Sequence, residues 1–250
     1  FAFGEGATRG VWTRRAVRWL YRVSLKRATC VIFQNPDDLA EFERLGLIEH
    51  GRGHVVNGSG VDLQQFSPVP LPGSSTFLLI ARLLADKGIR EYVEAARQVR
   101  ESFPHARFLL VGWYDDNPQA LSREEVDNWV RDGWIEYLGR LDDVRPAIAE
   151  ADVYVLPSYR EGTPRTVLEA MAMSRPIITT DVPGCRQTVV DGVNGFLVPP
   201  RDSGALAQAM TCFLSEPGLV SRMGKESRRL AEERFDAHAV ATAVVNAARL

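Results

Sequence analysis

Two carboxylates stand eight positions apart in the stretch YREGTPRTVLEAM, residues 159–171. Glu161 precedes a Gly-Thr-Pro turn, and Glu169 falls within a segment that the sequence predicts as a helix. By the helical repeat, Glu169 lies about two turns along that helix and about 80° around from Glu161. Two carboxylates so placed can accept hydrogen bonds from hydroxyl groups at two points of one extended polyol ligand.

The turn between the two glutamates favours an anion or a sugar hydroxyl. Thr163 suits the N-cap of the helix and Pro164 its first position. The backbone N–H groups of the first turn are then unpaired, and they point out with the positive end of the helix dipole. Gly162 has no Cβ, so a ligand can approach the backbone closely there.

A plainer reading of the same residues stays open. Glu161 can be a solvated loop residue, and Glu169 can pair with Arg165 four positions earlier. The segment ARLLADKG adds a basic pair, Arg82 and Lys87, on either side of a tight turn into a helix. Such a pair alone can be surface charge, but beside a helix N-terminus and two carboxylates it completes a site for a diphosphate joined to sugars.

The elements that must position these side chains form an α/β pattern. Short apolar runs alternate with helical segments from residue 76 onward, which predicts a Rossmann-like, doubly wound parallel sheet. The predicted strands are 76–81, 107–112, 135–139, 153–157, 177–180 and 195–198. Because ligands bind beyond the carboxyl ends of such strands, we expect the loops after them to form one crevice.

Helix signals support the same arrangement. Apolar residues recur at helical spacing over 89–103, and Ser122 with Glu125 forms a capping box. After Asp202 the pattern is wholly helical.

The chain divides into three predicted parts. Residues 1–50 hold a basic helix over 11–27, a strand and a helix with Asn35 as N-cap. This is too little to form a core of their own, so they are expected to be the remnant of another, N-terminal domain. Residues 51–75, rich in Gly, Pro and Ser, read as a linker. Residues 76–250 form the predicted α/β domain, with a helical C-terminus.

The basic helix has two possible roles. Arg14, Arg18, Arg22 and Lys26 form one stripe, and Trp12, Ala16, Trp19 and Val23 form an apolar stripe beside it. Such a helix can lie on an anionic membrane surface. Alternatively, the apolar stripe packs within the N-terminal domain and the cations form a solvated face.

Composition excludes several classes of protein. A formal net charge of −2 over 250 residues is less basic than a nucleic-acid-binding protein normally is. Three widely spaced cysteines suggest neither a disulfide framework nor a zinc site, and no apolar run is long enough to span a bilayer. We therefore expect a cytoplasmic protein with no bound metal, no nucleic acid and no cofactor, at the inner face of the cytoplasmic membrane if the helix binds lipid.

The motifs together resemble the retaining nucleotide-sugar glycosyltransferases of glycosyltransferase family 4, with the GT-B fold. The resemblance rests on the two glutamates in SYREGTPRTVLEAMA, on ARLLADKGI, on NGSGVDLQQF and on TTDVPGCRQTVVDGVNGFLVPPRD. It implies the C-terminal half of a GT-B enzyme of bacterial surface polysaccharide or lipopolysaccharide synthesis. Residues 76–250 would be its donor-nucleotide-sugar-binding domain, and residues 1–50 the remnant of its N-terminal, acceptor-side domain. The donor implied is a hexose or N-acetylhexosamine on a nucleoside diphosphate, with UDP favoured by analogy, and the acceptor is a glycan or a polyprenyl-linked glycan.

The resemblance also implies roles for single residues. Arg82 and Lys87 would bind the diphosphate and, with Glu161 on a hydroxyl of the donor sugar, carry catalysis. Glu169 would bind the ribose. The remaining donor contacts would come from Arg140 and Leu141 near the base and from Gly162, Thr163 and Pro164 at the helix start. Ala81 departs from the family, which often has Gly there.

The motifs also bear on other activities that related folds carry. The first strand-to-helix turn lacks the G-x-G-x-x-G of a dehydrogenase, and the chain has no G-x-S-x-G of an α/β hydrolase. A nucleotide-sugar epimerase and a non-catalytic nucleotide-sugar-binding module remain open alternatives.

Overall fold

The larger part of the molecule is a six-stranded parallel sheet, as the sequence predicts. The computed structural model describes residues 11–248, apart from the side chains of residues 11–14 and 217. The strand order is β5-β4-β3-β6-β7-β8, and every pairing is parallel. The strands are β3 (Thr76–Ile80), β4 (Arg107–Val111), β5 (Glu136–Tyr137), β6 (Val153–Leu156), β7 (Ile177–Thr180) and β8 (Gly195–Val198). Each lies within its predicted range, and β5 is the most shortened.

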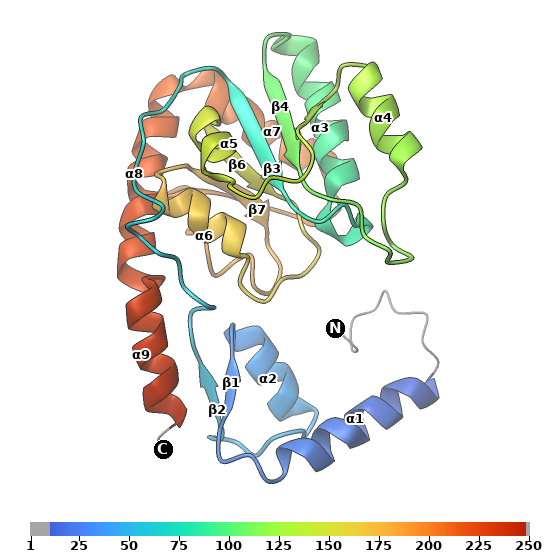
Figure 1. The fold of residues 1–250 in the computed structure, drawn as a ribbon, viewed down its shortest axis with the longest axis vertical. Helices are drawn as coiled ribbons and strands as arrows, with labels where there is room; N and C mark the ends of the chain where they lie inside the picture. The colour runs from blue at the N-terminus through green and yellow to red at the C-terminus, as the bar shows by residue number, and fades with distance from the viewer. Residues whose placement is uncertain (1–10, 249–250) are drawn as a thin grey trace.

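Helices cover both faces of this sheet (Figure 1). Alternate side chains of β3 point to opposite faces, so that Phe77 and Leu79 belong to one core cluster and Leu78 and Ile80 to the other. The first cluster is closed by α3 (Ile89–Ser102), α4 (Arg123–Arg131) and α7 (Ser203–Ser215). The second is closed by α5 (Arg145–Glu150), α6 (Arg165–Ala172) and part of α8 (Pro217–Arg234). The doubly wound α/β class is therefore confirmed.

Residues 11–55 form a small unit below the sheet domain in the view of Figure 1. It contains α1 (Val11–Leu25), β1 (Val31–Phe33), α2 (Pro36–Arg44) and β2 (Gly53–Val55). Asn35 is confirmed as the N-cap of α2, since its side chain accepts from the amide of Asp38. The reading of residues 51–75 as a plain linker is wrong at its start, because β2 pairs in parallel with β1. The composition of β2, which includes a glycine and a histidine, does not favour a strand. Its extended conformation comes from pairing with β1.

The C-terminal helices cross the segment that joins the small unit to the sheet domain. After α8, α9 (Ala237–Ala248) continues down to the level of β1 and β2 in the view of Figure 1. The amide of Val61 donates to Phe235 O at 2.7 Å, and the amide of Ala237 donates back to Val61 O at 3.1 Å. Gly60 has φ +71°, and a Cβ there would lie 2.6 Å from the Cα of Ala237, so that close crossing requires glycine. Within residues 11–248 none of the helices has the length and apolar character that crossing a bilayer requires.

Candidate functional site

The loops after β3 and β6 meet where the order of the strands reverses. From this point the chain winds outward through β4 and β5 on one side and through β7 and β8 on the other, and such switch points are where open α/β sheets bind ligands. The amide of Tyr159 donates to Asp86 O at 2.9 Å, which ties the two loops together. The predicted tight turn is a 3₁₀ helix, η1 (Ala85–Lys87), closed by Gly88 with φ +69°. A Cβ on Gly88 would lie 2.1 Å from Pro157 O, so no other residue fits there.

Lys87 and Glu161 form an ion pair across this switch point. Lys87 Nζ lies 2.6 Å from Glu161 Oε1, and the two side chains are only 14% and 16% exposed. Ser158 Oγ donates to the same carboxylate oxygen at 2.7 Å. The amide of Glu161 donates to Pro183 O, which links the site to the loop after β7. Sequence reasoning brought Lys87 and Glu161 together correctly but did not single out Ser158, whose position directly after a buried strand was its signal.

Arg82 does not share the partner of Lys87. Its Nη1 pairs with Asp115 Oδ2 at 3.0 Å, and its side chain is 48% exposed. Asp115 follows β4, so this cation lies on the side of the crevice away from Glu161. The predicted basic pair is therefore divided between two carboxylates, and Arg82 is the more accessible to a ligand from solvent.

The predicted start of α6 is wrong by one residue. The N-cap is Pro164, with φ −73° and ψ 111°, and α6 begins at Arg165. The hydroxyl of Thr163 does not cap the helix, because it donates to Gln34 O at 3.0 Å. Because this hydroxyl bonds to Gln34, it does not accept a hydrogen bond from an amide of α6. The first turn of α6 therefore has no side-chain cap.

Glu169 is buried on α6, at 9% exposure. Its Oε1 lies 3.7 Å from Arg165 Nη2, so the ion pair of the plainer reading is present, though at long range. Burial raises the pKa of Glu169 above its usual range, and the charge of Arg165 opposes that shift. Glu169 is thus a largely desolvated carboxyl group in surroundings of low dielectric, where hydrogen bonds are stronger than in water.

Two glycines fix the backbone around Glu161. A Cβ at Gly162 would lie 2.3 Å from Oε1 of Gln34, so the space beside this glycine that was expected to admit a ligand is occupied by the Gln34 side chain. Gly184 has φ +84°, and a Cβ there would lie 2.2 Å from Glu161 O and 2.4 Å from Gly162 O. Sequence reasoning placed Gly184 in a strand-end loop without giving it a role. The Pro-Gly pair after β7 was the available signal.

Arg140 and Leu141 follow the edge strand β5 and point to different surroundings. Leu141 is partly buried against the second core cluster. The exposed guanidinium of Arg140 lies 5.6 Å from the ring centre of Trp113, which follows β4 and is itself exposed. The structure thus keeps Arg140 at the crevice side of the sheet, with an aromatic neighbour that sequence reasoning did not assign.

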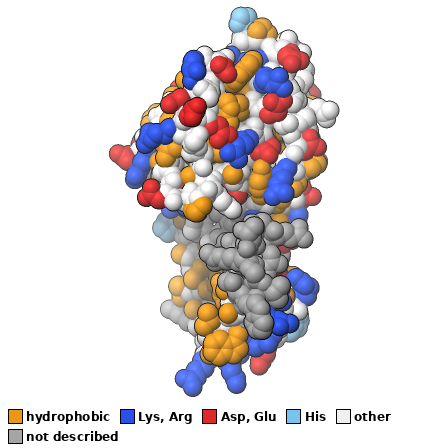
Figure 2. All heavy atoms as spheres, turned by 90° about the vertical axis from the view of Figure 1, so that its right-hand side faces the viewer, with side chains coloured by type: hydrophobic (Ala, Val, Ile, Leu, Met, Phe, Trp, Pro, Cys, Tyr) orange, Lys and Arg blue, Asp and Glu red, His pale blue; other side chains and the backbone are white. Residues whose placement is uncertain are grey.

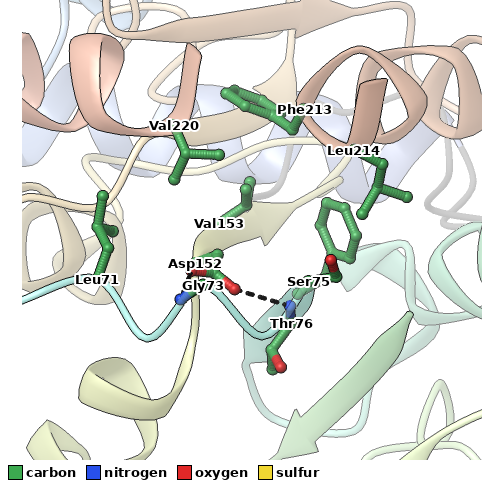
Figure 3. Close-up of a pocket in the computed structure, with 10 residues that line it drawn as sticks. Leu71, Gly73, Ser75, Thr76, Asp152, Val153, Phe213, Leu214 and Val220 are labelled. Carbon is green, nitrogen blue, oxygen red and sulfur yellow. Dashed lines mark hydrogen bonds between the residues drawn. The ribbon is translucent and has the colours of Figure 1, made fainter. Parts of the chain in front are cut away.

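A cavity lies at the amino ends of β3 and β6, away from the loops described above (Figure 3). It has a volume of about 200 Å³ and is lined by the first residues of β3 and β6 and by apolar side chains of α7 and α8. Its carboxylate, Asp152, accepts from the amides of Gly73, Ser74 and Thr76. Asp152 is therefore engaged in holding the chain that enters β3. The candidate site is instead formed by the loops at the carboxyl ends of β3 and β6.

Comparison with known proteins identifies relatives of the chain. The sequence model of the family described as glycosyl transferases group 1 matches residues 74–216. A Campylobacter jejuni enzyme, N,N'-diacetylbacillosaminyl-diphospho-undecaprenol alpha-1,3-N-acetylgalactosaminyltransferase, is 29% identical over 86% of this chain and 58% of its own length. The capsular polysaccharide biosynthesis glycosyltransferase CapM of Staphylococcus aureus is 24% identical over 64% of the chain. The chain thus spans about three fifths of the length of the first of these relatives.

Solved structures share the fold. Sucrose-phosphate synthase of Thermosynechococcus elongatus superposes with a TM-score of 0.81, at 27% identity, over 99% of this chain and 63% of its own. Anabaena HepE in complex with UDP superposes with a TM-score of 0.80 at 20% identity, over 92% of this chain and 67% of its own. The arrangement described above is therefore that of the GT-B glycosyltransferases.

Proposed function

Because the chain belongs to the glycosyl transferases group 1 family and has the GT-B fold, we propose that its crevice binds the donor of a glycosyl transfer reaction. The donor is a nucleoside diphosphate sugar carrying a hexose or an N-acetylhexosamine. UDP is the proposed nucleoside diphosphate, by analogy with HepE. The acceptor is a glycan or a lipid-linked glycan of a bacterial surface polysaccharide, as relatives in polysaccharide synthesis suggest.

The observation that carries this proposal is the Lys87–Glu161 ion pair at the β3/β6 switch point. Lys87 could bind a phosphate, and Glu161 beside it could accept a hydrogen bond from a sugar hydroxyl. A ligand in which a diphosphate is joined directly to a sugar presents these two groups side by side. Arg82 at the mouth of the crevice adds a second cation for the diphosphate. The first-turn amides of α6 add donors for the same anion.

The mechanism follows from where charge develops. When the bond between the sugar and the diphosphate breaks, negative charge grows on the leaving oxygen. Lys87 and Arg82 stabilise that charge more in the transition state than in the ground state, and removal of either is expected to raise the barrier by about 3 kcal/mol. Glu161 orients the sugar through a hydroxyl, and Glu169 holds the ribose hydroxyls. We propose transfer with retention by front-face attack, in which the leaving phosphate takes the acceptor's proton, without a bound metal or cofactor.

The acceptor side of the proposal involves α1. Trp19 is 63% exposed, and Leu20 and Val23 are also exposed beside it. Figure 2 shows hydrophobic side chains next to Lys and Arg at the lower end of this face. The predicted stripe members Trp12 and Arg14 lie outside the described side chains. We propose that α1 contacts an anionic membrane and so brings the site to a lipid-linked acceptor at the inner face of the cytoplasmic membrane.

Calorimetric titration of the chain with UDP, GDP and ADP tests the donor site. Saturable binding of one nucleotide, weakened in both Lys87→Ala and Glu169→Ala, is expected. A folded chain that binds none of the three would overturn the proposed donor site. Full binding retained in both variants would place the nucleotide elsewhere on the molecule.

A further inference from the structure

The backbone beside Glu161 is held by a segment more than a hundred residues earlier in the chain. Asn35 is fully buried, and its Nδ2 donates to Gly162 O at 3.0 Å and to Asp38 Oδ2 at 2.9 Å. The neighbouring carbonyl of Gln34 accepts from Thr163 Oγ1 at 3.0 Å. The junction between β1 and α2 therefore touches two of the residues proposed to bind the donor.

A second set of contacts reaches the same loop from the other side. Asp37 accepts from Arg186 Nη1 at 3.0 Å and from Gln187 Nε2 at 2.8 Å. The amide oxygen of Gln187 in turn accepts from Gly184 N at 2.8 Å. Since Gly184 packs directly against the carbonyl of Glu161, Asp37 is connected to Glu161 through the loop after β7.

A third set grips the residue before Glu161. Arg160 pairs with Asp38 and with Glu41, the latter at 3.0 Å between Nη2 and Oε2. Asp37 and Asp38 are in the first turn of α2, where the helix dipole stabilises negative charge. Partly exposed ion pairs contribute little one by one, but the three sets together leave the loops 160–163 and 184–187 little freedom to move relative to α2.

We propose that residues 34–41 are a positioning element of the donor site, in which Asn35 and Asp37 set the placement of the Glu161 and Gly162 backbone. This inference rests on the proposed function, because it assumes that these two residues contact the donor. The segment lies outside the residues matched by the family model. Its consequence is reciprocal: if contacts with α2 favour nucleotide binding, nucleotide binding must strengthen the contacts with α2.

Substitutions that spare the fold test the proposal. Asn35→Ser keeps an oxygen that caps α2 but removes the amide that donates to Gly162 O. Asp37→Ala removes the acceptor of both Arg186 and Gln187, whereas Asp37→Asn keeps an oxygen for Gln187. We expect the affinity for UDP to fall about fivefold or more in Asn35→Ser and Asp37→Ala, and less in Asp37→Asn.

The control removes a comparable carboxylate far from the site. Glu94→Ala deletes an ion pair with Arg97 on α3 and is expected to leave UDP affinity unchanged. Titrations are made well below the melting temperature of each variant, so that a merely structural role would lower the melting temperature without changing the affinity. Hydrogen exchange adds a second readout: UDP is expected to slow amide exchange in α2 of the unsubstituted chain, and much less so in Asp37→Ala.

The outcomes separate this inference from the proposed function. If UDP binds and neither Asn35→Ser nor Asp37→Ala changes its affinity, the positioning role is wrong. If the unsubstituted chain binds no nucleotide, the proposed donor site fails. Amide exchange without ligand then decides the positioning role: faster exchange confined to loops 159–164 and 184–187 in both variants supports it, and unchanged or uniformly faster exchange overturns it.

Discussion

The ammonium group of Lys87 and the carboxylate of Glu161 lie 2.6 Å apart, although 74 residues separate them in the chain. Parallel strands bring them together, because Lys87 follows β3 and Glu161 follows its neighbour β6. Both side chains are largely shielded from water, so each depends on the other for charge compensation. A polyanionic ligand would compete with Glu161 for the ammonium group of Lys87. The carboxylate of Glu161 could then accept a hydrogen bond from a hydroxyl group of the ligand.

Removal of Lys87 should destabilise the chain through the carboxylate it leaves behind. In Lys87→Ala, Glu161 keeps only the hydroxyl of Ser158 as a side-chain donor among the described contacts. We expect the free energy of unfolding in urea to fall by about 1 to 3 kcal/mol. Adding Glu161→Gln should recover part of this loss, because the stranded charge is gone. A double variant that is less stable than Lys87→Ala would argue against the mutual dependence of the pair.

Glu169 should make the free energy of unfolding of the chain depend on pH. Because burial raises its pKa above the ordinary value of 4.5, the folded chain keeps this proton to higher pH than the unfolded chain does. The free energy of unfolding therefore falls as pH rises from 4.5 to the raised pKa. Glu169→Gln removes that fall, so its stability relative to the unsubstituted chain should improve between pH 4 and pH 7 in urea unfolding. A constant difference across this range would contradict the shift.

Gly184 should be needed for the site as well as for the turn. Gly184→Ala places a Cβ against the carbonyls of Glu161 and Gly162, whereas Gly192, with φ +73°, has no atom within 4 Å of an added Cβ. Gly192→Ala should lose about 1 to 2 kcal/mol from left-handed strain alone. Gly184→Ala should lose more and also bind UDP more weakly. Equal losses in the two variants, with unchanged affinity, would show that Gly184 serves only the turn.

Arg175 should be a major contributor to stability without a role in binding. Its guanidinium is fully buried and donates to the carbonyls of Val69, Pro70, Ile148, Ala149 and Met173. Burial lowers its pKa to about 10, so the side chain stays charged at neutral pH. Arg175→Met leaves these carbonyls without a donor and should lose about 3 to 5 kcal/mol. The stability of Arg175→Lys should lie between that of the unsubstituted chain and that of Arg175→Met. The affinity of the folded fraction for UDP should not change in either variant.

The apolar surface of α1 should determine membrane binding. The chain is expected to sediment with vesicles of phosphatidylglycerol at low salt and much less with neutral phosphatidylcholine. Trp19→Ser should weaken this association, because the Trp19 indole is a large apolar group that is exposed to solvent. Trp113→Ser, which removes another exposed indole far from α1, is the matched control. If Trp19→Ser and Trp113→Ser bind the vesicles equally well, the apolar stripe of α1 does not bind the membrane and instead packs within the protein.

The sequence by itself determined the parallel sheet and the edge of the sheet at which the candidate site residues lie. Buried β-branched runs alternate with helices, and this pattern fixes strands whose carboxyl ends lie together. Lys87 and Glu161 could be placed at the same edge of the sheet in advance, because each lies in the loop that follows a predicted strand. The capping of α2 by Asn35 and of α4 by Ser122 was also legible, since N-capping is a local interaction between residues three positions apart.

Only the tertiary structure decided how the site is supported. Thr163 satisfies every local rule for an N-cap, yet its hydroxyl bonds to Gln34, and β2 becomes a strand because β1 lies beside it. Nothing in the spacing of Asn35 or Asp37 could place them against Gly162 and Gln187. Hydrogen bonds and ion pairs are short-ranged, so their partners are settled by which loops packing brings into contact, and one sequence carries no local record of that.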